Sequence, residues 1–141
     1  MANDSDIFGR VFLLTRDFER SFRDQGDKNL STTQFQALAI LRDGDPITAM
    51  DMAVRLKVAG PTATRTLDSL ERRHLVLRER DPHDRRVVWL RLTETGANVW
   101  EAQQRRQVEW ASELVKDLSG EERQQLVVLL DKITSGAADA E

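Results

Sequence analysis

The chain has 141 residues, of which 40% are hydrophobic, with a formal net charge of −3 and no cysteine. This length fits one domain with helical extensions, and the absence of cysteine excludes disulfides, thiol redox switches and cysteine-ligated zinc. There is no run of about eighteen apolar residues, and the first six residues are acidic rather than apolar, so we expect no membrane span, no signal peptide and a cytoplasmic location.

The first predicted helix starts at Asp4 or Ser5, either of which could cap it, and runs to about Asp24. The segment 25–28, Gln-Gly-Asp-Lys, is expected to end it. Its apolar residues recur at intervals of three and four, which is helical spacing; they are Ile7, Val11, Leu14, Phe18 and Phe22, with Phe8 and Phe12 widening the stripe. A second helix is predicted from Ser31, which forms a capping-box pattern with Gln34, to the stop at 43–46.

Two short helices are predicted next. Ile47 is a candidate strand residue, and Thr48 with Asp51 caps a third helix that ends near Lys57 and Val58. The apolar stripe expected to be buried on this helix consists of Met50, Ala53, Val54 and Leu56. Gly60 and Pro61 then open a fourth helix. Two helices joined by about three residues have the spacing of a helix-turn-helix.

The fourth helix has a predicted core side and a predicted outer side. Ala63, Leu67 and Leu70 recur at helical spacing and define the core side. The outer side then carries Pro61, Arg65, Asp68 and Arg72, flanked by Thr62, Thr64 and Ser69. Small hydroxyls and arginines suit contacts with bases and phosphates. The alternative is an ordinary solvated helix face, which Asp68 fits better.

A β-hairpin is predicted after this helix. Residues 75–77 lead into an arginine-rich tip at 78–86, which contains the turn Asp81-Pro82, and residues 87–92 lead out. A helix followed by a basic hairpin is the arrangement of a winged helix-turn-helix, in which the helix enters the major groove and the wing reaches phosphate or minor groove. Ion pairs with nearby aspartates, Asp84 with Arg86 in particular, could hold the wing arginines. Alternatively, Arg85 and Arg86 simply keep a turn soluble.

Charge is segregated along the chain in the same way. Between Arg55 and Arg91 there are ten Lys or Arg against five Asp or Glu, a local charge of +5 that leaves −8 for the remainder. A basic region on an acidic protein is the footprint expected where one face meets phosphates. The candidate DNA-binding residues are Thr62, Thr64, Arg65, Ser69, Arg72, Arg78, Arg85 and Arg86.

The last two predicted helices are long and amphipathic. Thr93 caps a fifth helix from Glu94 to about Lys116, and Ser119 with Glu122 caps a sixth, with residues 136–141 frayed. The apolar residues of the sixth helix are Leu126, Val127, Leu129, Leu130 and Ile133. We interpret Trp100 and Trp110, on the fifth helix, as core or interface residues. No catalytic motif, metal-ligand spacing or cofactor loop is present, so we expect no enzyme, metal or cofactor.

Three short motifs resemble the signature of MarR-type transcriptional regulators. These are Leu-Glu-Arg-Arg-His-Leu-Val at 70–76, the Asp-x-Arg element formed by Asp84 and Arg86, and Leu-Thr-Glu-Thr-Gly at 92–96. The number and order of the outer helices also match, so the resemblance covers nearly the whole chain. His74 departs from the pattern, because the family usually has glycine there.

The resemblance implies a mainly α fold with a small β-hairpin wing (α+β), a winged helix-turn-helix with flanking dimerisation helices. It implies one structural domain with an N-terminal dimerisation helix at 1–30, a DNA-binding lobe at 31–93 and C-terminal dimerisation helices at 94–135. It further implies a homodimer that represses transcription from a pseudo-palindromic operator of double-stranded DNA. Many family members respond to a small aromatic or phenolic ligand between lobe and dimer helices.

One alternative function of another class is left open by the sequence. A helical protein-interaction module could use the same basic lobe to bind an acidic protein partner. The dependence of random-duplex binding on salt discriminates the two, because phosphate contacts make DNA binding fall steeply as salt rises.

Overall fold

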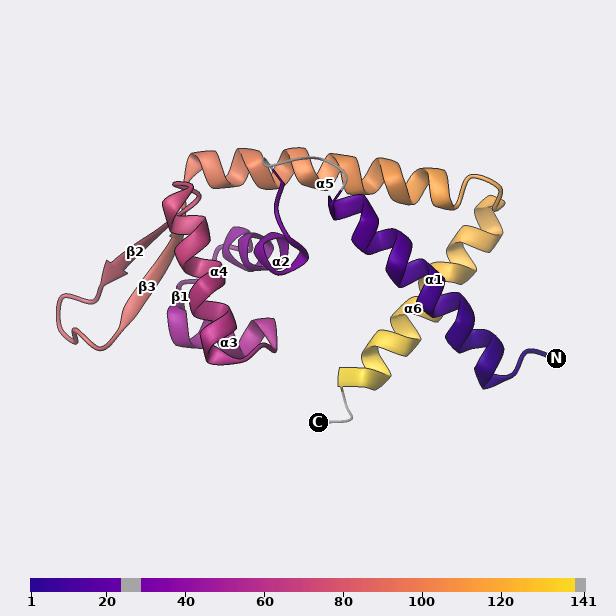
Figure 1. The fold of residues 1–141 in the computed structure, drawn as a ribbon, viewed down its shortest axis with the longest axis horizontal. Coiled ribbons are helices and arrows are strands. Elements are labelled where there is room, and N and C mark those ends of the chain that lie inside the picture. The colour runs from indigo at the N-terminus through magenta and orange to yellow at the C-terminus, as the bar shows by residue number, and fades with distance from the viewer. Residues whose placement is uncertain (24–28, 139–141) are drawn as a thin grey trace. The chain divides into compact units, whose positions relative to one another are not determined.

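The computed structural model describes residues 1–23 and 29–138, the side chains of 137 and 138 excepted. The elements in chain order are α1 (Asp4–Arg23), α2 (Thr32–Arg42), β1 (Ile47–Thr48), α3 (Ala49–Leu56), α4 (Gly60–Arg72), β2 (Val76–Arg80), β3 (Val88–Leu92), α5 (Glu94–Leu114) and α6 (Gly120–Ala138) (Figure 1). The predicted fold class is confirmed: a mainly helical chain with a small antiparallel sheet. The chain divides into two compact units, residues 1–106 and 107–141.

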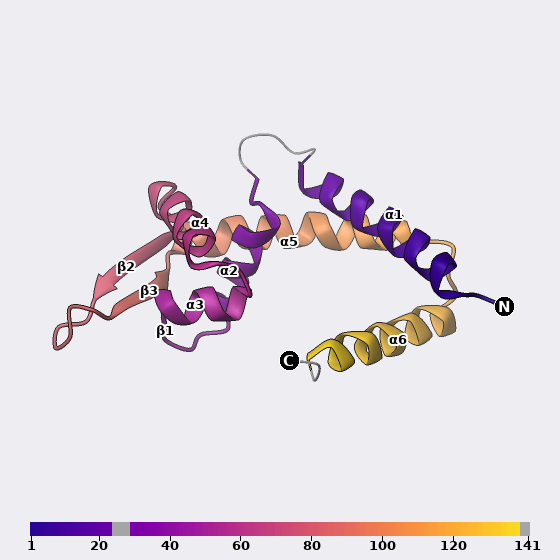
Figure 2. The same ribbon diagram turned by 60° about the horizontal axis from the view of Figure 1, so that its bottom comes forward.

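The winged lobe lies within the first unit. Its antiparallel sheet has the strand order β1-β3-β2, and the hairpin runs from the pair Val76 and Leu92 to the pair Arg80 and Val88. The core joins side chains of α2, α3, α4 and the sheet, namely Leu30, Ala37, Leu38, Leu41, Ile47, Met52, Leu56, Leu67, Leu70, Leu75, Val76 and Leu90. The far end of the hairpin projects beyond the helices of the lobe in both views (Figures 1 and 2).

Most helix starts lie where local sequence predicts them. The Ser31–Gln34 capping box is present, Thr48 accepts from the Asp51 N–H, and Ser119 with Glu122 caps α6. The start of α1 was predicted wrongly. Asn3 rather than Asp4 or Ser5 caps it, because the Asn3 carboxamide accepts from the Asp6 N–H while the Asp6 carboxylate accepts from the Asn3 N–H. The predicted stop at 25–28 lies outside the described residues.

The buried stripe of α3 was predicted correctly at Leu56 and wrongly at Met50 and Val54. Met52 and Leu56 are buried, whereas Met50 and Val54 are 78% and 73% exposed. This eight-residue helix carries apolar residues on two sides, so periodicity alone could not choose between them. Packing against α2, α4 and β3 selects the side that carries Met52.

The start of the hairpin tip also needed correction. Arg78, Glu79 and Arg80 belong to strand β2 rather than to the tip, because they continue the ladder with β3.

The C-terminal tail was also predicted wrongly in part. α6 runs to Ala138, so residues 136–138, which were expected to be frayed, are helical. Alanine is the strongest helix former, and one glycine at 136 does not outweigh it.

A Schellman turn ends α4 and aims the chain into the wing. The His74 N–H donates to the Glu71 carbonyl, the Leu75 N–H donates to the Leu70 carbonyl, and both leucines are buried together. His74 has φ of 57°, in the left-handed region. An L-residue there costs roughly 1–2 kcal/mol, which is why glycine is usual at such a position.

Candidate nucleic-acid interface

Helix α4 presents a polar surface away from the core of the lobe. Ala63, Thr66, Leu67 and Leu70 are its buried residues. The residues on the opposite side that are exposed to solvent are Thr64, Arg65, Asp68 and Arg72. Pro61 stands in the first turn, where its missing N–H costs no helical hydrogen bond. The structure therefore brings Thr64, Arg65 and Arg72 onto one accessible face.

Two flanking residues of α4, Ser69 and Thr62, are less accessible for contacts with DNA. The Ser69 hydroxyl is half-buried and accepts from the Gln34 side-chain amide of α2 at 2.9 Å. Thr62 is half-buried as well, and its carbonyl accepts from the Thr66 hydroxyl at 2.9 Å. Ser69 thus connects α4 to α2, a contact between distant segments that helical periodicity could not indicate.

The tip of the wing is ordered by Asp81. Its carboxylate accepts from the backbone N–H groups of His83 at 2.8 Å and Asp84 at 3.0 Å, and from the Trp89 indole N–H at 2.9 Å. These donors, the indole first, hold the pKa of the Asp81 carboxyl below its usual range. The turn between the strands is therefore a structured loop that places the arginines following it.

Arg86 is held and exposed at the same time. Its Nε and Nη2 donate to the two oxygens of Asp84 at 3.1 and 3.2 Å, and its side chain is 91% exposed. The same arginine lowers the pKa of the Asp84 carboxyl. An exposed pair of this kind adds little to stability, but its fork geometry fixes the direction of the guanidinium. Arg85, next to it, is also exposed.

Arg78 lies in a different environment from the other candidates. Its Nη1 donates to Asp68 Oδ1 at 2.6 Å and to Glu71 Oε2 at 2.7 Å, and its side chain is 25% exposed. It therefore joins β2 to α4. Sequence reasoning placed it at the hairpin tip and missed both carboxylates. The usable signal was the two-residue period of β2, which puts Arg78 on the same face as buried Val76.

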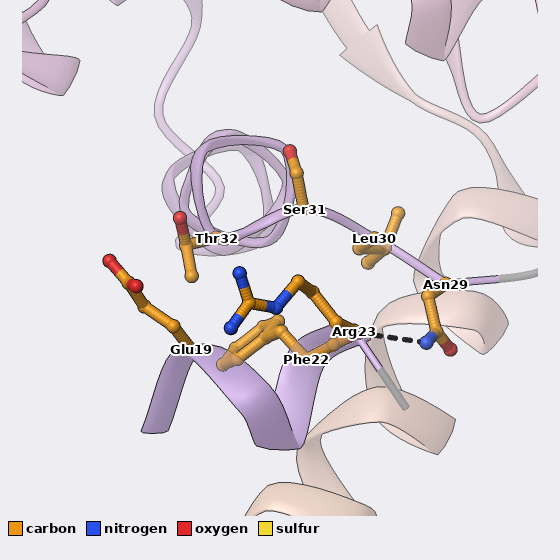
Figure 3. A pocket seen from close by; sticks show the side chains of 7 residues that line it. All are labelled: Glu19, Phe22, Arg23, Asn29, Leu30, Ser31 and Thr32. Carbon is orange, nitrogen blue, oxygen red and sulfur yellow. Dashed lines mark hydrogen bonds between the residues drawn. The ribbon is translucent and has the colours of Figure 1, made fainter. Parts of the chain in front are cut away.

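A separate pocket of about 460 Å³ lies between the end of α1 and the start of α2 (Figure 3). Its lining residues are Glu19, Phe22, Arg23, Asn29, Leu30, Ser31 and Thr32. The Asn29 amide donates to the Phe22 carbonyl at 2.8 Å, and Phe22 stacks edge-on against Phe35 of α2 with ring centroids 5.7 Å apart. Within residues 1–23 and 29–138, no cluster of His, Asp and Glu could hold a metal ion.

The lobe as described defines a winged helix-turn-helix protein. The family model of the MarR family matches residues 30–88. The multiple antibiotic resistance protein MarR of Salmonella typhimurium is 34% identical over 142 residues, covering 94% of this chain and 99% of that protein. The HTH-type transcriptional regulator YkoM of Bacillus subtilis is 30% identical over 126 residues, covering 89% and 80%. The chain therefore belongs to the MarR family of transcriptional regulators.

Solved structures agree with this fold. A crystal structure of MarR covers 94% of this chain and 98% of its own, with a TM-score of 0.82 at 24% identity. A mutant MarR from E. coli complexed with operator DNA covers 93% and 96%, with a TM-score of 0.74 at 28% identity. In the part of the chain that the structure describes, the helices are too short or too polar for one to cross a membrane.

Proposed function

We propose that this protein is a sequence-specific regulator that binds double-stranded DNA as a homodimer and represses transcription. The observation that carries the proposal is the accessible face of Thr64, Arg65 and Arg72 on α4, beside a wing that holds Arg86 outward. In a winged helix-turn-helix, such a helix reads base edges in the major groove. The similar mutant MarR from E. coli was solved in complex with operator DNA, which supports DNA as the ligand.

Each side chain has a distinct role in this proposal. Arg65, near the start of α4, is the candidate for base reading, since arginine pairs with guanine through two hydrogen bonds. Arg72, Arg85 and Arg86 are candidates for contacts with phosphates or the minor groove, which position the protein without selecting sequence. Thr64 can contact bases or phosphate through its hydroxyl.

The experiment that tests the function uses Arg65→Ala. Duplexes selected from a random pool and unselected duplexes are titrated with wild type and variant across a salt series. We expect wild type to bind both duplexes with a steep salt dependence. Arg65→Ala should shrink the preference for selected DNA by roughly 1–3 kcal/mol, the value of a bidentate arginine–guanine contact.

The control is Arg16→Ala, which removes an exposed arginine from α1 and should preserve the preference. Equal losses on both duplexes would make Arg65 a phosphate contact only. If wild type does not bind duplex DNA at moderate salt, the DNA-binding function is wrong, and the interaction module with an acidic protein partner becomes the better hypothesis.

The homodimer is proposed from the apolar surface of the outer helices. Large apolar side chains of α1 and α6 are exposed, namely Ile7, Phe8, Val11, Phe12, Leu13, Leu14, Phe18, Val127, Val128, Leu129, Leu130 and Ile133. Large apolar side chains exposed along a helix mark an interaction surface on each of these helices. A second copy of the chain is the occupant that a two-fold operator requires.

A small aromatic or phenolic acid is the proposed effector, and the pocket in Figure 3 is its proposed site. The pocket is lined by the aromatic ring of Phe22 and the guanidinium of Arg23. It also adjoins the N-terminus of α2, where the helix dipole is positive and favours an anion. Such a ligand weakens DNA binding only by the difference in its affinity for the two states. Salicylate titrated into the protein–operator complex should release DNA from wild type, and Arg23→Gln should require more salicylate. Release from both at the same concentration would exclude this site.

A further inference from the structure

A single arginine of β2, Arg78, binds both acidic side chains of α4, the proposed DNA-reading or recognition helix. The Arg78 guanidinium lies 2.6 Å from the Asp68 carboxylate and 2.7 Å from that of Glu71. Asp68 and Glu71 are three residues apart on α4, which places them side by side on the helix surface. The three groups form one network that joins β2 to α4.

The strand register explains why Arg78 faces α4. Val76, two residues earlier in β2, is fully buried, and alternate residues of a strand share a face. Leu77, on the opposite face, is 46% exposed. Arg78 therefore points from the hairpin toward the helix, whereas the exposed Arg85 and Arg86 lie beyond the strand, in the tip.

The acidic pair poses an electrostatic problem for a DNA-reading helix. Asp68 and Glu71 line the same open hollow on α4 as Arg65 and Arg72. Unneutralised carboxylates at that place repel phosphates, and a free carboxylate also accepts from cytosine, which alters the sequence that is read. Arg78 balances much of this charge from within the protein.

We propose that Arg78 is a positioning residue rather than a DNA contact. It offsets the negative charge of Asp68 and Glu71 beside the DNA-reading residues of α4 and fixes the angle of the wing relative to α4. This inference rests on the proposed DNA-binding function, and it reassigns a side chain that the sequence placed among the DNA contacts. Because Arg78 acts through the two carboxylates, replacing it should have little effect on DNA affinity when Asp68 and Glu71 are neutral.

The experiment is a cycle of variants of the full chain. Arg78→Gln is made in wild type and in the Asp68→Asn, Glu71→Gln background, and affinity for a selected duplex is measured at one moderate salt concentration. We expect Arg78→Gln to weaken binding on the order of tenfold in wild type, because it leaves like charges facing each other. In the neutral background we expect a loss of less than about twofold, since the partners are already absent.

A matched control and a second readout separate the explanations. Arg86→Gln should cost the same factor in both backgrounds, because Asp68 and Glu71 are not its partners. Amide hydrogen exchange of β2 in the free protein should be faster in Arg78→Gln, while circular dichroism stays that of folded protein. Equal losses for Arg78→Gln in both backgrounds, or unchanged exchange, would overturn the positioning role. Absence of duplex binding by wild type would instead overturn the proposed function, and the exchange measurement would still decide whether Arg78 fixes the wing.

Discussion

Replacing Gly96 by alanine should destabilise the folded protein by roughly 3 kcal/mol, the upper part of the range for overpacking a dense site. Gly96 lies in the first turn of α5 and is buried. A Cβ at this position would stand 2.1 Å from the Leu75 carbonyl oxygen and 2.8 Å from Leu92 Cδ1. The first of these is a backbone atom, so a rotamer change cannot relieve the clash.

The carbonyl also has little freedom to move. It accepts from the Thr93 N–H at 3.1 Å, and the Thr93 hydroxyl donates to the His74 carbonyl at 2.7 Å while accepting from the Gly96 N–H at 2.9 Å. Shifting α5 outward would disrupt these bonds and the packing of Leu92. The start of α5, the end of α4 and the base of the wing therefore meet at this glycine.

Urea unfolding at one fixed protein concentration measures the effect, since dimerisation would make the midpoint depend on concentration. Gly9→Ala is the matched control, because Gly9 is also helical and a Cβ there meets nothing within 4 Å. That substitution should be neutral or stabilise by up to about 1 kcal/mol. Similar midpoints for Gly96→Ala and wild type would contradict the close approach.

Features set by neighbouring residues could be read from the sequence. A cap needs a side-chain acceptor and an N–H three residues later, so Ser31, Thr48 and Ser119 were identified from composition and spacing alone. The core side of α4 followed from one clear apolar period.

Features set by distant residues could not be read in this way. Either side of α3 could have been buried, and only the packing of other elements decided for Met52. Arg78, Arg85 and Arg86 are the same residue type in one short segment, yet one binds the recognition helix and the others are exposed. The difference depends on where β2 ends, and strand ends are poorly defined by local sequence. The sequence therefore could not distinguish the arginine that binds α4 from the two that are exposed in the wing.

Substituting Phe12 by aspartate should dissociate the proposed dimer and lower affinity for a two-half-site operator on the order of a hundredfold, because linked binding of two lobes is lost. Phe12 lies on α1, is 57% exposed and contacts Phe8 with ring centroids 6.2 Å apart. Its exposure in a single chain means that a charge there should spare the fold of the monomer. In an apolar interface, the same charge would be buried without a partner, which is strongly unfavourable.

Sedimentation velocity and operator titration of the same samples test this, with circular dichroism to confirm folding. Arg20→Asp places the same charge on the same helix at an exposed position whose neighbours one turn away, Arg16, Asp17 and Arg23, are polar, and it should leave a dimer with wild-type affinity. A Phe12→Asp protein that remains dimeric and binds the operator as wild type does would show that the stripe on α1 is not the interface. A monomer that keeps full operator affinity would instead separate DNA reading from dimerisation. The exposed apolar surface of α1 would then need a different partner, since no DNA phosphate can cover it.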